Sequence, residues 1–128
     1  MSIDTAGRRR DRRFAVAKTG STYLELRAPD GSPEKVRLLD LSVAGLAFEA
    51  PEWLTASSVD TEIPGVVVHV EDCAIHGHML VLHVTPLSGP GRICGAHFYP
   101  ADESELARMA ALLSGLDAGR FDRGDEAW

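Results

Sequence analysis

Residues 35–49 read KVRLLDLSVAGLAFE, and this stretch decides the fold of the chain. Two short runs with apolar side chains, residues 35–40 and 45–49, flank the segment DLSVAG. Aspartate, serine and glycine are residues that turns use. The stretch therefore predicts two strands joined by a hairpin turn.

Strand patterns continue on both sides of this stretch. Residues 22–27 alternate, with Tyr23, Glu25 and Arg27 on one face, and the segment PDGS at 29–32 predicts a turn before the strand at 35–40. After a loop at 51–58, three further runs predict strands at 65–71, 74–85 and 92–99. Six antiparallel strands predict a mainly β fold, a closed or nearly closed barrel, which removes exposed strand edges.

The pattern changes to a helical period near the end of the chain. Leu106, Met109, Ala110 and Leu113 fall at i, i+3, i+4 and i+7, one stripe of a helix. Ala101 or Asp102 opens this helix, acidic residues follow in its first turn, and Gly115 is its predicted stop. We expect a C-terminal α-helix of about four turns that covers an open end of the barrel.

A chain of 128 residues with 45% apolar content is long enough for one hydrophobic core. We predict an N-terminal arm at 1–12, the barrel and helix at 13–116 and a loose tail at 117–128. No apolar run is long enough to cross a bilayer, so we expect a cytoplasmic protein without membrane insertion. Cys73 and Cys94 have no paired spacing and are expected to be buried, reduced thiols.

The charge of the chain is uneven. Residues 8–13 read RRRDRR, and this segment alone carries a charge of +4. The formal net charge is −6, so the rest of the chain carries −10, which repels a polyanion such as duplex DNA. A small anion fits this distribution better than a long one.

Two motifs carry the predicted chemistry. The first is an RxxxR spacing, Arg9 to Arg13, which leads directly into apolar Phe14; a basic solubilising or nucleic-acid arm is the alternative explanation. The second is DxSxxG, with Asp40, Ser42 and Gly45, for which a plain hairpin turn is the alternative.

In this order, the two motifs resemble the defining pair of the PilZ family. The late strand ICGAHF at 93–98, followed by a helix with an acidic start, is also similar to the family, so the likeness spans about residues 8 to 116. The resemblance implies a single PilZ-type β-barrel that binds the second messenger cyclic di-GMP (c-di-GMP) and signals to an effector protein. It implies no catalysis and no cofactor other than this ligand.

The resemblance also assigns roles to residues. Arg9 and Arg13 would hold the ligand, because a guanidinium forks onto phosphate oxygens, stacks on guanine and can donate to its O6 and N7 atoms. Asp40 would accept hydrogen bonds from guanine, and Ser42 would reach a base or a phosphate. Gly45 would adopt a positive φ and let the backbone approach the ligand.

The arm has a register ambiguity, because Arg8 and Arg12 also satisfy RxxxR. We prefer Arg9 and Arg13, since in the family the second arginine directly precedes the apolar entry to the barrel. Arg8 then stands just ahead of the motif, where an arginine implies a secondary contact and an intercalated pair of ligand molecules.

Other functions fit the sequence less well. His76 and His78 share a strand face but Cys73 points to the other, and nothing nearby completes a four-ligand zinc site. These histidines are interpreted as sheet-surface or interface residues. The motifs of common enzyme classes are absent from the sequence, so we do not expect an enzyme. The remaining alternative lies within the family: a PilZ-like module that binds no ligand and contacts proteins of pilus or flagellar machinery.

Overall fold

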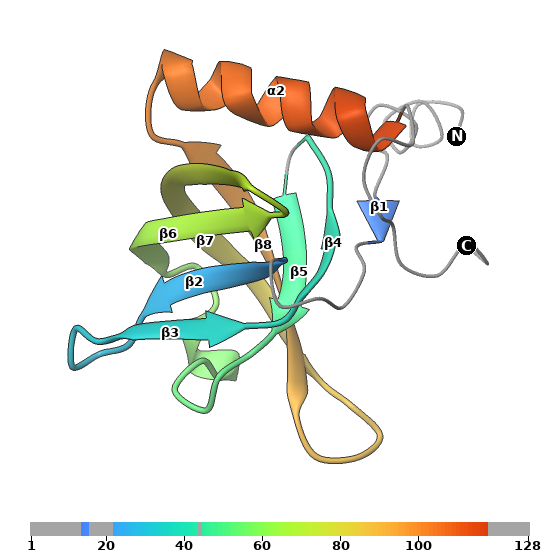
Figure 1. The fold of residues 1–128 in the computed structure, drawn as a ribbon. Coiled ribbons are helices and arrows are strands. Elements are labelled where there is room, and N and C mark those ends of the chain that lie inside the picture. Colours follow the sequence, from blue (N-terminus) through green and yellow to red (C-terminus); the bar gives the residue numbers. More distant parts are fainter. Residues whose placement is uncertain (1–13, 16–21, 44, 118–128) are drawn as a thin grey trace, which may run out of the picture.

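A computed structural model describes residues 14–15, 22–43 and 45–117 of the chain. Within these residues, one curled antiparallel sheet is followed by a C-terminal helix (Figure 1). The helix α2 spans Glu103–Asp117, and a short 3-10 helix η1 spans Ala56–Ser58. The strands are β1 (Phe14–Ala15), β2 (Tyr23–Arg27), β3 (Pro33–Val36), β4 (Leu38–Leu41), β5 (Gly45–Glu49), β6 (Glu62–Val70), β7 (Cys73–Pro86) and β8 (Arg92–Pro100).

The sheet curls into a barrel because the chain itself joins its two ends. The strand order is β1-β4-β5-β8-β7-β6-β2-β3, so β3 lies at one edge and β4 lies next to the other. Only Arg37 separates β3 from β4 in the sequence. The two ends of the sheet must therefore come close together, which confirms the predicted mainly β, barrel-like class.

The predicted number of six strands is wrong, because the described residues form eight. The expected strand at 35–40 is divided at Arg37, where the chain stops pairing with β2 and begins pairing with β5. This change of partner is the corner of the barrel. The other additional strand, β1, pairs only two residues with β4 and is too short to show a periodic pattern.

Alternating side chains of the strands fill the inside of the barrel. On β2, Leu24 and Leu26 are fully buried while Tyr23 and Glu25 are partly exposed. Burial of such a leucine or valine contributes about 1.5–3 kcal/mol. The same alternation on the other strands supplies the rest of the core, which includes Leu38, Leu41, Leu46, Phe48, Val66, Val68, Val70, Ile75, Met79, Val81, Cys94, Ala96 and Phe98.

Helix α2 lies across one end of the barrel (Figure 1) and begins where it was predicted to begin. The Asp102 carboxylate accepts a hydrogen bond of 2.9 Å from the backbone N–H of Glu105, which makes Asp102 the N-cap. The predicted buried stripe is only partly right. Met109 is buried, but Leu106 is 56% exposed and Ala110 is exposed.

The buried face of α2 is rotated toward the stripe formed by Met109, Leu112 and Leu116. Leucines occur on both stripes, so the spacing alone does not decide which one packs on the barrel. Gly115 is not the stop that the sequence predicted. It lies buried inside the helix, which continues to Asp117.

Both cysteines are free, as predicted. Cys94 is buried in the core, and this burial raises the pKa of its thiol to about 11. Cys73 is only half-buried. Among the described helices, none has the length and apolar content to span a membrane.

Candidate functional site

The DxSxxG segment forms the turn between β4 and β5. The backbone N–H of Ser42 donates to the carbonyl of Gly45 over 2.8 Å. In the reverse direction, the N–H of Gly45 donates to the Ser42 hydroxyl over 3.2 Å, and that hydroxyl lies 3.3 Å from the Gly45 carbonyl. Because the Ser42 side chain is only 1% exposed, its hydroxyl first of all holds the turn in shape.

Gly45 is required by space rather than by a positive φ. The expectation of a positive φ is wrong, since among the described glycines only Gly31, Gly65 and Gly91 have one. Gly45 opens β5 and pairs with His97 of β8. A Cβ at this position would collide with the backbone carbonyl oxygen of Ala96. The absence of a side chain therefore lets β5 approach β8 closely.

Asp40 lies on the outer face of the barrel. Its neighbour Leu41 is fully buried and Asp40 is half-buried, so the two side chains point to opposite faces. Asp40 pairs with Ala15 of β1 on one side and with Ala47 of β5 on the other. The carboxylate therefore lies on the central strand of three, between β1 and β5.

Next to Asp40, the outer face carries small residues. Ala47 of β5 pairs with Gly95 of β8, so Asp40, Ala47 and Gly95 follow one another across three adjacent strands. A Cβ on Gly95 would collide with the imidazole of His83, which shows that this ring lies over Gly95. Asp40 therefore lies beside the small side chain of Ala47, and the His83 ring covers Gly95 on the next strand. His97 follows two residues after Gly95, on the same face of β8.

The sequence did not predict these two histidines as part of the site. Their position depends on the pairing of β8 with β5 and β7, which joins segments far apart in the chain. The one available signal was the glycine in ICGAHF, because a glycine inside a strand marks a close approach.

Arg8, Arg9 and Arg13 lie outside the described residues. The structure does place the residue that follows them. Phe14 of β1 pairs with Leu41, the neighbour of Ser42, and Ala15 pairs with Asp40. The chain therefore enters the barrel, at Phe14, directly beside the DxSxxG turn.

No protein-family model and no curated protein matches the sequence. Solved structures do match. The PilZ domain of YcgR from Escherichia coli, determined with c-di-GMP, has a TM-score of 0.68 and 14% identity over 88% of this chain and 94% of that one. The chain has the PilZ fold.

Two further similar structures are larger than this PilZ fold. The K. pneumonia MrkH–c-di-GMP complex gives a TM-score of 0.73 and 21% identity over 88% of this chain and 53% of that one. Bacillus subtilis MotI/DgrA, an inhibitor of motility, gives 0.63 and 12% over 88% and 51%. The chain thus spans about half the length of these two proteins.

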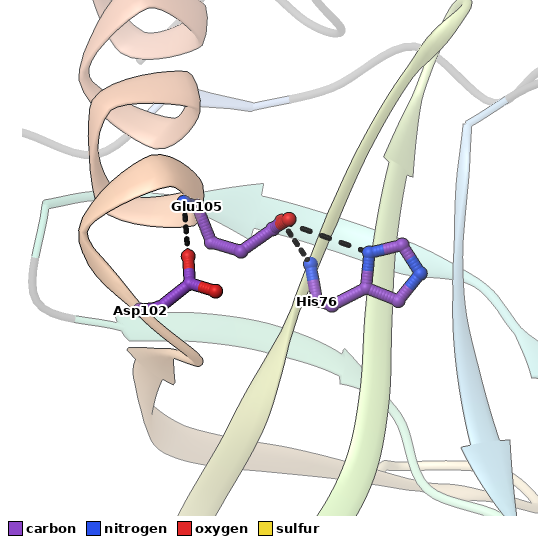
Figure 2. Close-up of polar contacts among 3 residues, drawn as sticks. All are labelled: His76, Asp102 and Glu105. Atoms are coloured by element: carbon purple, nitrogen blue, oxygen red, sulfur yellow. Dashed lines mark hydrogen bonds and ion pairs between the residues drawn. The ribbon is translucent and has the colours of Figure 1, made fainter.

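The helix of the PilZ fold is attached to the barrel by contacts around Glu105 (Figure 2). The Glu105 carboxylate accepts a 2.8 Å hydrogen bond from the backbone N–H of His76 and lies 3.6 Å from the imidazole Nδ1 of that residue. The backbone N–H of Ala101 donates to the carbonyl of His76 over 2.9 Å. These contacts fix the start of α2 on β7.

The histidines of this PilZ barrel do not gather into a metal site. Over residues 14–15, 22–43 and 45–117, no group of three or more histidine, cysteine, aspartate and glutamate side chains could hold a metal ion. His76 instead faces Glu105, and the His78 ring stacks on Tyr99.

Proposed function

We propose that this chain is a receptor for c-di-GMP, without catalytic activity, that signals to a partner protein. The observation that carries the proposal is the pairing of β1 with β4, which brings the residue after the arginine motif against Leu41, beside the DxSxxG turn. The first described residue after the arginine motif is thereby brought to the DxSxxG turn, about thirty residues further along the sequence.

Chain connectivity keeps both arginines within reach of the turn. Arg13 directly precedes Phe14, and consecutive Cα atoms lie about 3.8 Å apart. Arg9 stands five residues before Phe14, so its Cα stays within about 18 Å of that residue. This distance allows the arm to fold back over the turn.

The residue chemistry suits a cyclic dinucleotide with two phosphates and two guanines. In this proposal, Arg9 and Arg13 bind phosphate or guanine through bidentate hydrogen bonds, and Arg8 adds a secondary contact. Asp40 accepts from the guanine N1 and N2 groups. The Ser42 hydroxyl and Gly45 keep the turn in a shape that the ligand can approach.

The structural relatives support the same ligand class. The YcgR and MrkH structures contain c-di-GMP as their bound ligand. We extend that ligand to this chain because the DxSxxG turn lies where β1, which directly follows the arginine motif in the sequence, pairs with β4. We also place the protein in the cytoplasm, where it would act on an effector protein through the surface that ligand binding creates.

Titration calorimetry of the wild-type protein with c-di-GMP tests the proposal and gives the ligand number. Removal of one charge-assisted bond by Arg9→Ala or Arg13→Ala should weaken affinity about ten- to a hundred-fold. Arg37→Ala is the matched control, because Arg37 contacts Glu49 over 3.5 Å at the other end of β4 and β5. Its affinity should equal that of the wild type.

A wild-type protein that gives no heat and no thermal shift with c-di-GMP would overturn the proposal. It would favour the alternative of a ligand-independent PilZ module that contacts pilus or flagellar proteins. Equal affinity for the wild type, Arg9→Ala and Arg13→Ala would reject the arginine assignment but keep the receptor.

A further inference from the structure

Three aromatic rings form a continuous surface on the outside of β7 and β8. Tyr99 and His78 are register partners, and their rings stack with centroids 5.1 Å apart and planes 24° apart. The His97 ring lies 6.2 Å from the Tyr99 ring and is tilted by 58°. Since Ala96 and Phe98 are buried, His97 and Tyr99 point outward, and Tyr99 is 42% exposed.

This aromatic surface begins beside the DxSxxG turn. His97 is the register partner of Gly45 on one side and of Leu80 on the other. Gly45 contributes no side chain to the outer face, so the His97 ring is next to the turn on the β5 side. Tyr99 and His78 then extend the surface away from the turn.

A guanine base is planar, and bases stack on exposed aromatic side chains irrespective of their hydrogen-bonding edges. We propose that one guanine of c-di-GMP stacks on the surface formed by His97 and Tyr99, while the other end of the ligand is held at Asp40 and the turn. This inference rests on the proposed function and adds two contact residues to it. The His78 ring, which stacks on Tyr99, holds the Tyr99 ring in position.

The chain contains a matched pair of rings elsewhere on the barrel. Tyr23 and His69 are also register partners, with stacked rings 4.3 Å apart and planes 19° apart. They lie on β2 and β6, which β7 separates from β8 in the sheet order. The ammonium of Lys35 lies 4.6 Å from the centre of the Tyr23 ring and occupies that surface. This second pair therefore provides a control with the same ring chemistry on strands that are not next to the DxSxxG turn.

Calorimetric titration with c-di-GMP tests the inference. His97→Ala and Tyr99→Ala should each weaken affinity about ten-fold, the order of one base stacked on one ring. His97→Phe, which keeps a planar ring, should stay within about two-fold of the wild type. Tyr23→Ala and His69→Ala should bind as the wild type does.

Three results would overturn the inference. The first is wild-type affinity in both His97→Ala and Tyr99→Ala, and the second is an equal loss in the Tyr23→Ala control. The third is a loss in His97→Phe as large as in His97→Ala. If Arg9→Ala weakens binding while the His97 and Tyr99 variants do not, the proposal of guanine stacking is rejected and the proposal of a c-di-GMP receptor is retained. If the wild type does not bind, both fail together.

Discussion

Gly45 is the residue at which the turn of the candidate site meets the barrel wall. A methyl group at this position would meet the Ala96 carbonyl, which is backbone and cannot rotate away. We predict that Gly45→Ala lowers the free energy of unfolding by about 1–3 kcal/mol, because β5 and β8 must move apart. Urea denaturation measures this value, and c-di-GMP affinity should fall with it.

Gly89 supplies the control for this substitution. It lies in the loop between β7 and β8, and a Cβ there would have nothing within 4 Å. Gly89→Ala should therefore change the free energy of unfolding by less than about 0.5 kcal/mol. Equal effects of the two substitutions would show that the close approach of β5 to β8 is not what Gly45 provides.

At the scale of elements, the attachment of α2 to β7 depends on Glu105. Its carboxylate is the acceptor for the His76 backbone N–H, and its side chain is only 15% exposed. Glu105→Ala leaves that N–H without this acceptor and should lower the free energy of unfolding by about 1–3 kcal/mol in urea denaturation.

Two variants separate this contact from a general effect of charge. Glu105→Gln keeps an acceptor oxygen and should recover most of the lost stability. Glu103→Ala removes an exposed acidic residue from the same first turn, so only its favourable interaction with the helix dipole is lost, about 0.3–1 kcal/mol. A loss for Glu103→Ala as large as that for Glu105→Ala would contradict the role of the contact.

The elements themselves were predictable where a local pattern sets them. The strand at 45–49 was predicted with the bounds that β5 has, and the run at 92–99 became β8 with one further residue. The start of the helix was predicted at Ala101 or Asp102 from local chemistry, and Asp102 is its N-cap. The corner at Arg37 was not, because a change of strand partner is a tertiary event that leaves no period in the sequence.

The site was predictable to a similar degree. The turn at 40–45 was predicted from its residue types, and its position beside the chain that leaves the arginine motif came from the pairing of β1 with β4. His97 could not be assigned from sequence, because only the register between β5 and β8 puts it opposite Gly45. The buried position of Ser42 was also unpredictable, since a turn serine can either point to solvent or close the turn with its hydroxyl.

At the scale of the whole molecule, the distribution of charge favours binding of a small anionic ligand over binding of a long polyanion. MrkH of K. pneumonia is described as a c-di-GMP-dependent transcription regulatory factor, but this chain spans only 52% of it. Outside residues 8–13 the chain carries −10, against +4 within them. A duplex that contacts the basic segment must therefore also approach an acidic body.

We predict that the protein does not shift an arbitrary DNA duplex in a gel at about 150 mM salt, with or without c-di-GMP. A few arginine–phosphate contacts give an affinity that falls steeply with salt, and repulsion by the body weakens it further. A faint shift at about 50 mM salt that Arg9→Ala and Arg13→Ala abolish is compatible with this view. A complex that persists at the higher salt, and that c-di-GMP strengthens, would instead make the basic segment a DNA-binding arm and the dinucleotide its regulator.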